Sequence, residues 1–294
     1  MNGYTKKHRA FALVLSGGGG RGLAHAGVLR ALEHYGYRPQ AIVGVSMGAI
    51  VGATYALNPD WYHALVNMDT RAFPEPTRPT GDDLRARIRA MLASERALLE
   101  MLLGWGVGER SVEAGMELLR NLTAGKRLEE GRIPVAVIAA DIQSGQRVVF
   151  QRGPAAEALY ASSALPGILP PFRRGEAMLV DGSYVDNAPV DVARNFGTEI
   201  VIAVDASQTQ EPSEIRNGFQ AMLRAMEICH HQHTQIRFEE ADLVIKPHYP
   251  FAIETLDFNH KRLCVAVGMR AVRQSMAKLD RLLSRRPAQS RSRR

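Results

Sequence analysis

Ser46 stands at the centre of a G-x-S-x-G pentapeptide, a pattern that is typical of a nucleophilic serine. Gly44 and Gly48 are the small residues two before and two after it, which let a strand turn sharply into a helix and lift the hydroxyl above the sheet. The pentapeptide alone also occurs at ordinary turns, so the flanking sequence matters. Here an apolar run precedes it at residues 41–45, and an almost wholly apolar run follows at residues 47–57. We therefore predict that Ser46 is a nucleophile on a strand-to-helix turn.

A serine hydroxyl needs a base that accepts its proton, and in most hydrolases of this kind the base is a histidine held by a carboxylate. The histidines of this chain offer no obvious base. His230, His231 and His233 fall in a predicted helix with polar neighbours, where a solvated face is a simpler interpretation than a set of metal ligands. His25 follows the first glycine cluster, where packing is the simpler role. The base is therefore sought among the carboxylates.

Asp181 is the carboxylate with the most favourable position in the sequence. It directly follows the apolar run at residues 178–180 and begins the motif Asp181-Gly182-Ser183. The motif puts an acid at the carboxyl end of a strand, beside a flexible glycine, and ligands bind at the carboxyl ends of strands in open α/β sheets. We predict that Asp181 is the base and that Gly182 and Ser183 complete its motif.

A glycine-rich loop near the N-terminus suits a site for a negatively charged oxygen. We call it the glycine loop, and its members are Gly17, Gly18, Gly19, Gly20, Arg21 and Gly22. The loop satisfies G-x-G-x-x-G after a strand, but a dinucleotide site would need an acid at the end of the second strand, and none is present. A Walker loop would need Lys followed by Ser or Thr where Arg21 and Gly22 stand. The remaining prediction is an oxyanion hole of backbone N–H groups at a helix N-terminus.

The order of the apolar runs predicts an α/β fold, with a mostly parallel central sheet flanked by helices. A strand at residues 11–15, a helix at 22–35, a strand at 41–45 and a helix at 47–57 follow one another. This β-α-β-α order implies parallel strands joined by right-handed crossovers. Further strands are predicted at residues 133–139, 147–150, 178–180, 200–204 and 243–245, and further helices at residues 112–121, 214–238 and 259–283.

The predicted strands lie on both sides of a segment of different character. We therefore predict one domain, residues 10–283, with a helical cap inserted at residues 60–131. Within the cap, a proline-rich stretch precedes a Leu- and Met-rich helical stretch at residues 82–103. For this stretch two interpretations remain open, ordinary core packing and a lid that covers an acyl-chain groove and touches a membrane. Residues 284–294 are predicted to form a disordered, Arg-rich tail.

The formal net charge of +7 is concentrated at the two ends of the chain. Five arginines lie in the tail, and Lys6, Lys7 and Arg9 lie near the N-terminus, which leaves the rest of the chain close to neutral. A near-neutral body argues against a nucleic-acid partner. The tail is either solvated or attracted to anionic lipid headgroups, and both interpretations remain open.

The composition is that of a globular protein, with 294 residues of which 46% are hydrophobic and 23% are charged. Two cysteines are too few for a disulfide scaffold and favour a reducing compartment. No run reaches the roughly 18 apolar residues of a membrane span. We expect a cytoplasmic protein, soluble or peripheral at the membrane.

Three motifs in this order, G-G-G-x-R-G, G-x-S-x-G and D-G-x, resemble those of the patatin-like phospholipase family. The resemblance runs from about Phe11 to about Asp205, and it includes the segments 161–171 and 181–189. One departure is Ser183, where the family usually has Ala or Gly, a change that leaves Asp181 in place. The resemblance implies hydrolysis of lipid esters by a Ser–Asp dyad without histidine, metal or cofactor.

The implied mechanism agrees with the roles assigned from the residues. Asp181 would accept the proton as Ser46 attacks an ester carbonyl, water would then release the fatty acid, and the glycine loop would stabilise both oxyanions. Arg21 would orient the loop or meet a phosphate headgroup, unless it is a surface cation at a helix start. Phospholipids or lysophospholipids are the expected substrates. The alternatives are a carboxylesterase or thioesterase acting on soluble acyl substrates, and a non-catalytic lipid-binding regulatory protein.

Overall fold

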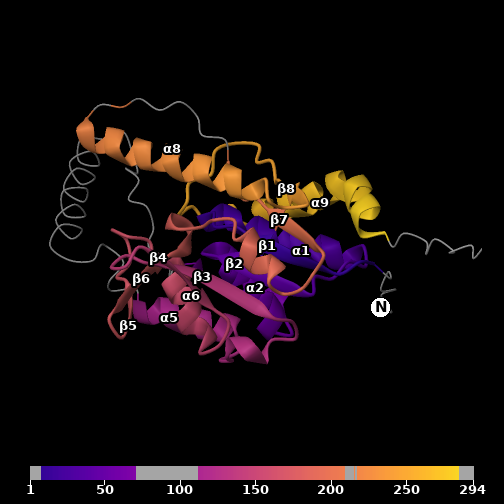
Figure 1. The fold of residues 1–294 in the computed structure, drawn as a ribbon, viewed down its shortest axis with the longest axis horizontal. Coiled ribbons are helices and arrows are strands. Elements are labelled where there is room, and N and C mark those ends of the chain that lie inside the picture. The colour runs from indigo at the N-terminus through magenta and orange to yellow at the C-terminus, as the bar shows by residue number, and fades with distance from the viewer. Residues whose placement is uncertain (1–7, 71–111, 209–214, 216, 285–294) are drawn as a thin grey trace, which may run out of the picture.

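A central β-sheet carries the fold in the computed structural model, which describes residues 8–70, 112–208, 215 and 217–284 (Figure 1). Within these residues the sheet has eight strands in the order β5-β6-β3-β2-β1-β7-β8, and β4 pairs with β3 beside this path. The strands are β1 (Phe11–Leu15), β2 (Ala41–Val45), β3 (Val135–Asp141), β4 (Gln146–Phe150), β5 (Phe172–Arg174), β6 (Ala177–Asp181), β7 (Ile200–Val204) and β8 (Leu243–Ile245).

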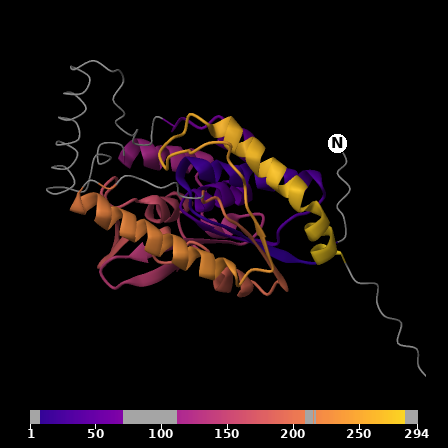
Figure 2. The same ribbon diagram turned by 90° about the horizontal axis from the view of Figure 1, so that it is seen from above.

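Helices cover both faces of this sheet. The α-helices are α1 (Ala24–His34), α2 (Met47–Leu57), α3 (Trp61–Val66), α5 (Val112–Leu122), α6 (Ala155–Ser163), α7 (Val190–Arg194), α8 (Gly218–Phe238) and α9 (Lys261–Leu283). Three short 3₁₀ turns are η1 (Gly19–Leu23), η4 (Leu128–Glu130) and η5 (Gly182–Tyr184). Seen from above, the long helices α8 and α9 lie on opposite sides of the sheet (Figure 2). None of the helices in the described ranges has the length and apolar character to cross a membrane.

Five neighbouring strands of the sheet, β3, β2, β1, β7 and β8, run parallel, as the β-α-β-α order predicts. The pairs β3–β2, β2–β1, β1–β7 and β7–β8 are all parallel, whereas β4 and β6 are antiparallel to β3, and β5 is antiparallel to β6. The prediction of a mostly parallel sheet flanked by helices is therefore confirmed.

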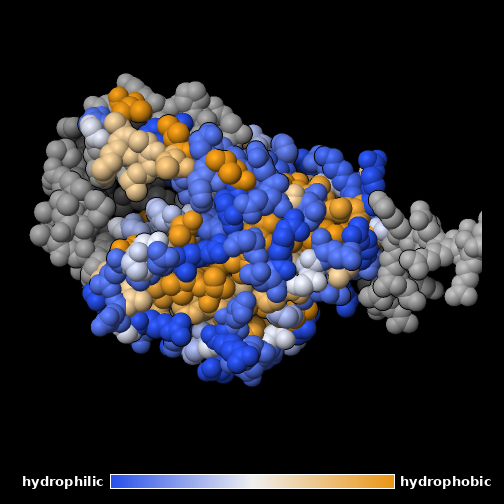
Figure 3. All heavy atoms as spheres, viewed as in Figure 1, coloured by the Kyte–Doolittle hydropathy of each residue, from blue (hydrophilic) through white to orange (hydrophobic). Residues whose placement is uncertain are grey.

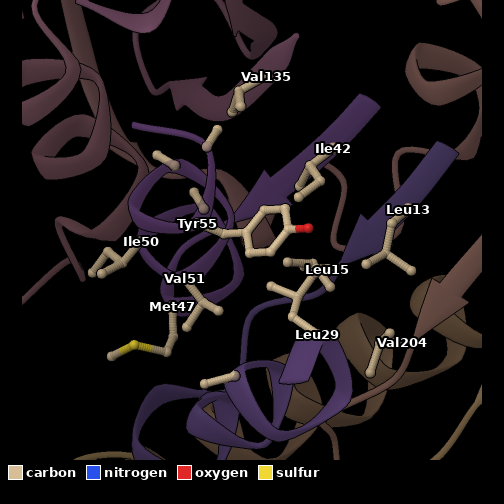
Figure 4. Packing of buried hydrophobic residues seen from close by; sticks show 14 of the residues in the cluster. Leu13, Leu15, Leu29, Ile42, Met47, Ile50, Val51, Tyr55, Val135 and Val204 are labelled. Carbon is tan, nitrogen blue, oxygen red and sulfur yellow. The ribbon is translucent and has the colours of Figure 1, made fainter. Parts of the chain in front are cut away.

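Alternating side chains of β1 divide the core into two layers, one on each face of the sheet. Phe11, Leu13 and Leu15 belong to the larger cluster, which α1, α2 and α9 cover, whereas Ala12 and Val14 belong to the smaller one beneath α7 and the end of α8. Figure 4 shows the larger cluster, with side chains of α1, α2 and the sheet packed together. Because strands of this kind are buried on both faces, they read in the sequence as unbroken apolar runs.

The ends of the predicted cap insertion pack into this same core. Trp61 and Leu65 of α3 and Leu119 and Leu122 of α5 are buried in the larger cluster. The helical stretch at residues 82–103 and the tail beyond Ser284 lie outside the described residues. The division into a domain, a cap and a tail therefore stays a prediction.

Helices α1 and α9 cross at two glycines without room for a side chain. A Cβ atom on Gly27 would lie 1.9 Å from the Val265 carbonyl oxygen, and a Cβ atom on Gly268 would lie 1.9 Å from the Ala24 carbonyl oxygen. Both neighbours are backbone atoms, so the helices themselves would have to separate.

We expect Gly268→Ala to lower the free energy of unfolding by about 3 kcal/mol, because overpacked cores lose roughly this amount. The matched control is Gly115→Ala in α5, where a Cβ atom would meet nothing within 4 Å. There alanine should raise the free energy of unfolding by about 1 kcal/mol, since glycine is the poorer helix former. Urea denaturation of the three proteins measures both values, and equal effects would contradict the close crossing.

Candidate active site

Ser46 occupies a strained turn between β2 and α2. Its backbone has φ 52° and ψ −123°, a left-handed conformation that costs a non-glycine residue roughly 1–3 kcal/mol. A Cβ atom on Gly48 would lie 2.2 Å from the Leu15 carbonyl oxygen, and one on Gly44 would lie 2.4 Å from the Ala49 Cα atom. Both glycines of the pentapeptide are therefore required by the close approach of strand and helix. Such strain clusters at functional sites.

The Ser46 backbone is also held from α6. Its N–H donates a hydrogen bond of 2.9 Å to the hydroxyl oxygen of Ser162, which is fully buried. Ser162 lies in the segment 161–171 of the family resemblance, but no pattern in the sequence indicates this contact. The turn is thus fixed by three elements, β2, α2 and α6.

Asp181 meets Ser46 because two strands end head to head along one edge of β3. Strand β4 occupies the other edge of β3 over residues 137–141, so β2 and β6 must share the remaining edge. On that edge Val45 pairs with Ile138 of the parallel strand β2, and Asp181 pairs with the next residue, Ala139, from the antiparallel strand β6. The residue after Val45 therefore faces the end of β6. Asp181 is the last residue of β6, so it lies at the carboxyl end of a strand as predicted, although β6 is antiparallel to β3.

The carboxylate of Asp181 is buried, with 1% of the residue exposed, and its Oδ1 accepts a 2.8 Å hydrogen bond from the Ser183 N–H. The hydroxyls of Ser46 and Ser183 also interact favourably with the ionised carboxylate. A Cβ atom on Gly182 would lie 2.2 Å from the Ile138 carbonyl oxygen, so only glycine lets the motif turn against β3. Burial raises the pKa of Asp181, and the interactions with Ser46 and Ser183 oppose this shift without cancelling it.

The raised pKa of Asp181 predicts the pH dependence of any reaction in which this carboxylate is the base. The ionised form is required, so kcat/KM should fall as the pH drops through a value above the ordinary aspartate range. Ser183→Ala removes a hydroxyl that lowers the pKa of Asp181 and should move this acid limb to higher pH. Initial rates on a soluble ester between pH 4 and 9 measure both effects.

Ser144→Ala is the matched control for this experiment. The Ser144 hydroxyl donates a 2.6 Å hydrogen bond to Asp141, a similar Ser–Asp contact in the turn between β3 and β4. Its removal should leave the acid limb where it is. An acid limb that does not respond to Ser183→Ala would contradict the assignment of the limb to Asp181.

The glycine loop lies against both Ser46 and the base motif. A Cβ atom on Gly17 would lie 3.4 Å from Ser46 Cβ and 3.5 Å from Ser183 Cβ. The Gly17 N–H donates to Asn187 Oδ1 at 2.7 Å, and the Gly20 N–H donates to the Thr255 carbonyl oxygen at 2.8 Å. These two N–H groups are thus engaged within the protein.

The N–H groups of Gly18 and Gly19 remain without an acceptor among the described residues. Of the six residues predicted for the oxyanion hole, these two offer backbone donors, and they directly follow Gly17, which lies against Ser46. Gly22 packs against Met47, because a Cβ atom there would lie 2.6 Å from Met47 Cγ. Arg21 is partly buried and donates from Nη1 to the Ile253 carbonyl oxygen at 3.0 Å, a contact that fits a role in orienting the loop.

Asn187 is held in place by an ion-pair network around the preceding Asp186. Arg147 of β4 and Arg237 of α8 contact the buried Asp186 carboxylate at 2.5 and 3.0 Å, and both arginines also contact Asp191. The network therefore connects the base block to the glycine loop through the Asn187 side chain. The sequence placed Asn187 in the base block without a role.

Two histidines lie near the candidate site, His25 beside the glycine loop and His230 beside the base motif. His25 is fully buried and donates from Nε2 to the Ser16 carbonyl oxygen at 2.8 Å, and burial lowers its pKa to about 4. His230 packs its ring against Tyr184 and hydrogen-bonds the Ser183 backbone, so α8 contacts the base motif. Burial and the neighbouring histidines lower the pKa of His230. Among the described residues, no cluster of three or more His, Cys, Asp or Glu forms a candidate metal site.

Comparison with known proteins agrees with this arrangement of serine, aspartate and glycine loop. The family model described as patatin-like phospholipase matches residues 13–194, more than half of the chain. The chain belongs to this family. The resemblance predicted from the three motifs is therefore confirmed, and β7, β8, α8 and α9 lie beyond the matched range of the patatin-like phospholipase model.

Individual relatives share the matched region and differ greatly in length. Patatin-like phospholipase domain-containing protein ZK370.4 of Caenorhabditis elegans is 33% identical over 204 residues, which cover 69% of this chain and 14% of that protein. The uncharacterized NTE family protein Rv1063c of Mycobacterium tuberculosis is 29% identical over 204 residues, covering 68% of this chain and 49% of that one. The chain thus spans half or less of the length of these relatives.

A solved structure shares the fold. VipD from Legionella pneumophila superimposes with a TM-score of 0.51 at 14% sequence identity, over 93% of this chain and 67% of that chain. Because 93% of the chain is covered, the shared fold extends beyond residue 194, where the match to the family model ends.

Proposed function

We propose that this protein is a serine acyl hydrolase that cleaves fatty-acyl esters of phospholipids or lysophospholipids. The observation that carries the proposal is the position of Ser46, on a strained turn at the end of β2, next to the buried Asp181 carboxylate, with which its hydroxyl interacts. A buried carboxylate with a raised pKa is a stronger base than a solvated one, which suits it to take a serine proton. Membership of the patatin-like phospholipase family supports the choice of a lipid ester.

The proposed reaction has two halves with the same residues in each. Asp181 takes the hydroxyl proton as Ser46 Oγ bonds to the ester carbonyl carbon, and the resulting oxyanion accepts hydrogen bonds from the N–H groups of Gly18 and Gly19. The alcohol then leaves with the proton from Asp181, and the acyl group remains on Ser46. Asp181 next takes a proton from water, which attacks the acyl carbon, and Ser46 leaves with that proton as the fatty acid is released.

Contact with a lipid surface is part of the proposal. Exposed apolar side chains on α8 include Met222, Met226 and Ile228, and Figure 3 shows apolar atoms along the outer surface of this helix. The same helix contacts the base motif through His230. The Arg-rich tail adds charge that anionic headgroups attract.

The test is to treat the full chain with a fluorophosphonate probe and to follow fatty-acid release from four substrates. These are phosphatidylcholine vesicles, the same vesicles with phosphatidylserine, lysophosphatidylcholine, and a soluble p-nitrophenyl butyrate. We expect labelling, release from at least one of the lipid substrates, and faster turnover when anionic lipid is present. Turnover of the soluble ester alone would indicate a carboxylesterase, and absence of both labelling and turnover would indicate a non-catalytic lipid-binding protein.

A further inference from the structure

The connection between β8 and α9, residues 246–260, packs directly against the glycine loop. The Gly20 N–H donates to the Thr255 carbonyl oxygen at 2.8 Å. A Cβ atom on Gly19 would lie 1.9 Å from that oxygen, and a Cβ atom on Gly20 would lie 2.2 Å from the Asp257 carbonyl oxygen. The backbone of the connection therefore touches the backbone of the loop at the residues next to the open N–H groups.

Side chains of both segments also connect the glycine loop to the β8–α9 connection. Arg21 reaches from the loop to the Ile253 carbonyl oxygen at 3.0 Å, and Tyr249 reaches from the connection to the Arg21 carbonyl oxygen at 3.0 Å. The Ala206 carbonyl oxygen lies farther from the Tyr249 hydroxyl, at 3.5 Å. Burial raises the pKa of Tyr249, so its hydroxyl remains a hydrogen-bond donor throughout the neutral range.

The connection is itself fixed to the sheet, so it can hold the loop in place. Gln208, just after β7, donates to the Phe251 carbonyl oxygen at 2.7 Å and accepts from the Ile253 N–H at 3.1 Å. Ile253 is 1% exposed and Asp257 is 6% exposed, so both anchor the connection in the core. A rigid support of this kind positions hydrogen-bond donors more accurately than a free loop does.

We infer that the β8–α9 connection holds the N–H groups of Gly18 and Gly19 in position for the oxyanion, and that Tyr249 is a positioning residue for the reaction. This inference rests on the proposed function. It assigns a role in the reaction to a part of the chain that lies beyond the match to the family model, which ends at residue 194. The alternative is that the connection only packs against the hydrophobic core and has no effect on the reaction.

Tyr249→Phe tests the inference with the smallest change. Removal of one hydrogen bond of this kind should lower kcat about five- to tenfold. The rate of fluorophosphonate labelling should fall by a similar factor, because both reactions pass through an oxyanion. KM for p-nitrophenyl butyrate and the acid limb of the pH profile should stay unchanged, since neither substrate binding nor Asp181 is altered. Amide hydrogen exchange should become faster in peptides that cover residues 17–23.

Tyr55→Phe is the matched control. The Tyr55 hydroxyl donates to Glu33 at 3.0 Å and its ring is buried in α2, far along the helix from Ser46. This variant should keep kcat within twofold of the wild type and leave exchange in residues 17–23 unchanged. A shift of melting temperature common to both tyrosine variants would measure the structural cost alone.

The inference is overturned if Tyr249→Phe keeps wild-type kcat, or if kcat falls while exchange in residues 17–23 is unchanged. A shifted acid limb would overturn it as well, because the effect would then act through Asp181. Failure of the proposed function has a different signature, namely a wild-type protein that neither labels nor hydrolyses any ester. In that case, unchanged amide hydrogen exchange at residues 17–23 in Tyr249→Phe would still contradict the support of the glycine loop by Tyr249. Faster exchange there would agree with it.

Discussion

Ser46→Ala and Asp181→Asn should each lower kcat by about 10⁴-fold or more, as loss of a catalytic serine or its partner does in other serine hydrolases. Ser46→Ala removes the oxygen that carries the acyl group. Asp181→Asn keeps the shape of the side chain but cannot accept the hydroxyl proton. Ester hydrolysis and fluorophosphonate labelling measured in parallel test both, and labelling should be lost in Ser46→Ala.

The double variant distinguishes a dyad from two independent residues. Residues that act as one unit show strongly non-additive losses, so Ser46→Ala combined with Asp181→Asn should be no slower than the slower single variant. If Ser46→Ala still labels, the nucleophile is another residue. If Asp181→Asn keeps more than about a tenth of the activity, Asp181 is not the base.

Melting temperatures separate this loss of activity from unfolding. The pKa of Asp181 is raised in the folded protein, so the folded state binds this proton more tightly than the unfolded state. The stability that this difference provides is present at low pH and is lost as the pH rises through the folded pKa. At pH 7 the ionised carboxylate therefore opposes folding, and Asp181→Asn should melt at or above the wild-type temperature. Lower stability of this variant would contradict the raised pKa.

The sequence predicts local elements well where burial makes a simple pattern. Strands β1 and β2 and helix α2 have the expected bounds, because apolar runs between glycines and a proline leave few alternatives. Strand β3 begins at Val135 rather than at residue 133 and extends to Asp141 where it pairs with β4 and β6. Helix α1 starts at Ala24, since Gly19–Leu23 form a 3₁₀ turn first.

Other elements lack a pattern that a single sequence reveals. Helix α6 is rich in alanine and has little difference between its faces because it is buried almost all round. Strand β5 is three residues long with two exposed arginines, and its pairing with β6 defines it more than its composition does. Helix α7, with only five residues, is too short to show a helical period.

Some residues of the candidate site can also be predicted from the sequence, and others cannot. Ser46 and Asp181 stand in short motifs whose glycines are required by nearby backbone, so residue types and spacing identify them. The reason that they meet is not local, since it depends on β2 and β6 ending head to head on β3. The contacts of Ser162, Asn187 and Tyr249 join segments that are more than 100 residues apart in the chain. No spacing rule could have found them.

Gly19→Ala should lower kcat by about 10²- to 10³-fold, which is the usual cost of losing an oxyanion donor. The new Cβ atom would lie 1.9 Å from the Thr255 carbonyl oxygen, at a backbone φ of 54° that disfavours any side chain. The loop must therefore move away from the β8–α9 connection, and the Gly18 and Gly19 N–H groups move with it. KM for a soluble ester should change much less, because the ground-state carbonyl depends less on these donors than the oxyanion does.

Gly145→Ala separates the displacement of the loop from backbone strain. Gly145 has φ 70° in the turn between β3 and β4, and a Cβ atom there would meet nothing within 4 Å. It should therefore share the strain, and the lower melting temperature, but keep wild-type kcat. Gly18→Ala gives an intermediate case, since its Cβ atom would lie 3.1 Å from Ala206 Cβ and the neighbour needs to shift only slightly. If all three variants had the same kcat, the glycine loop would have no part in stabilising the oxyanion. If instead the loss of kcat increased from the Gly145 variant to the Gly18 variant to the Gly19 variant, the rate would depend on the position of the loop.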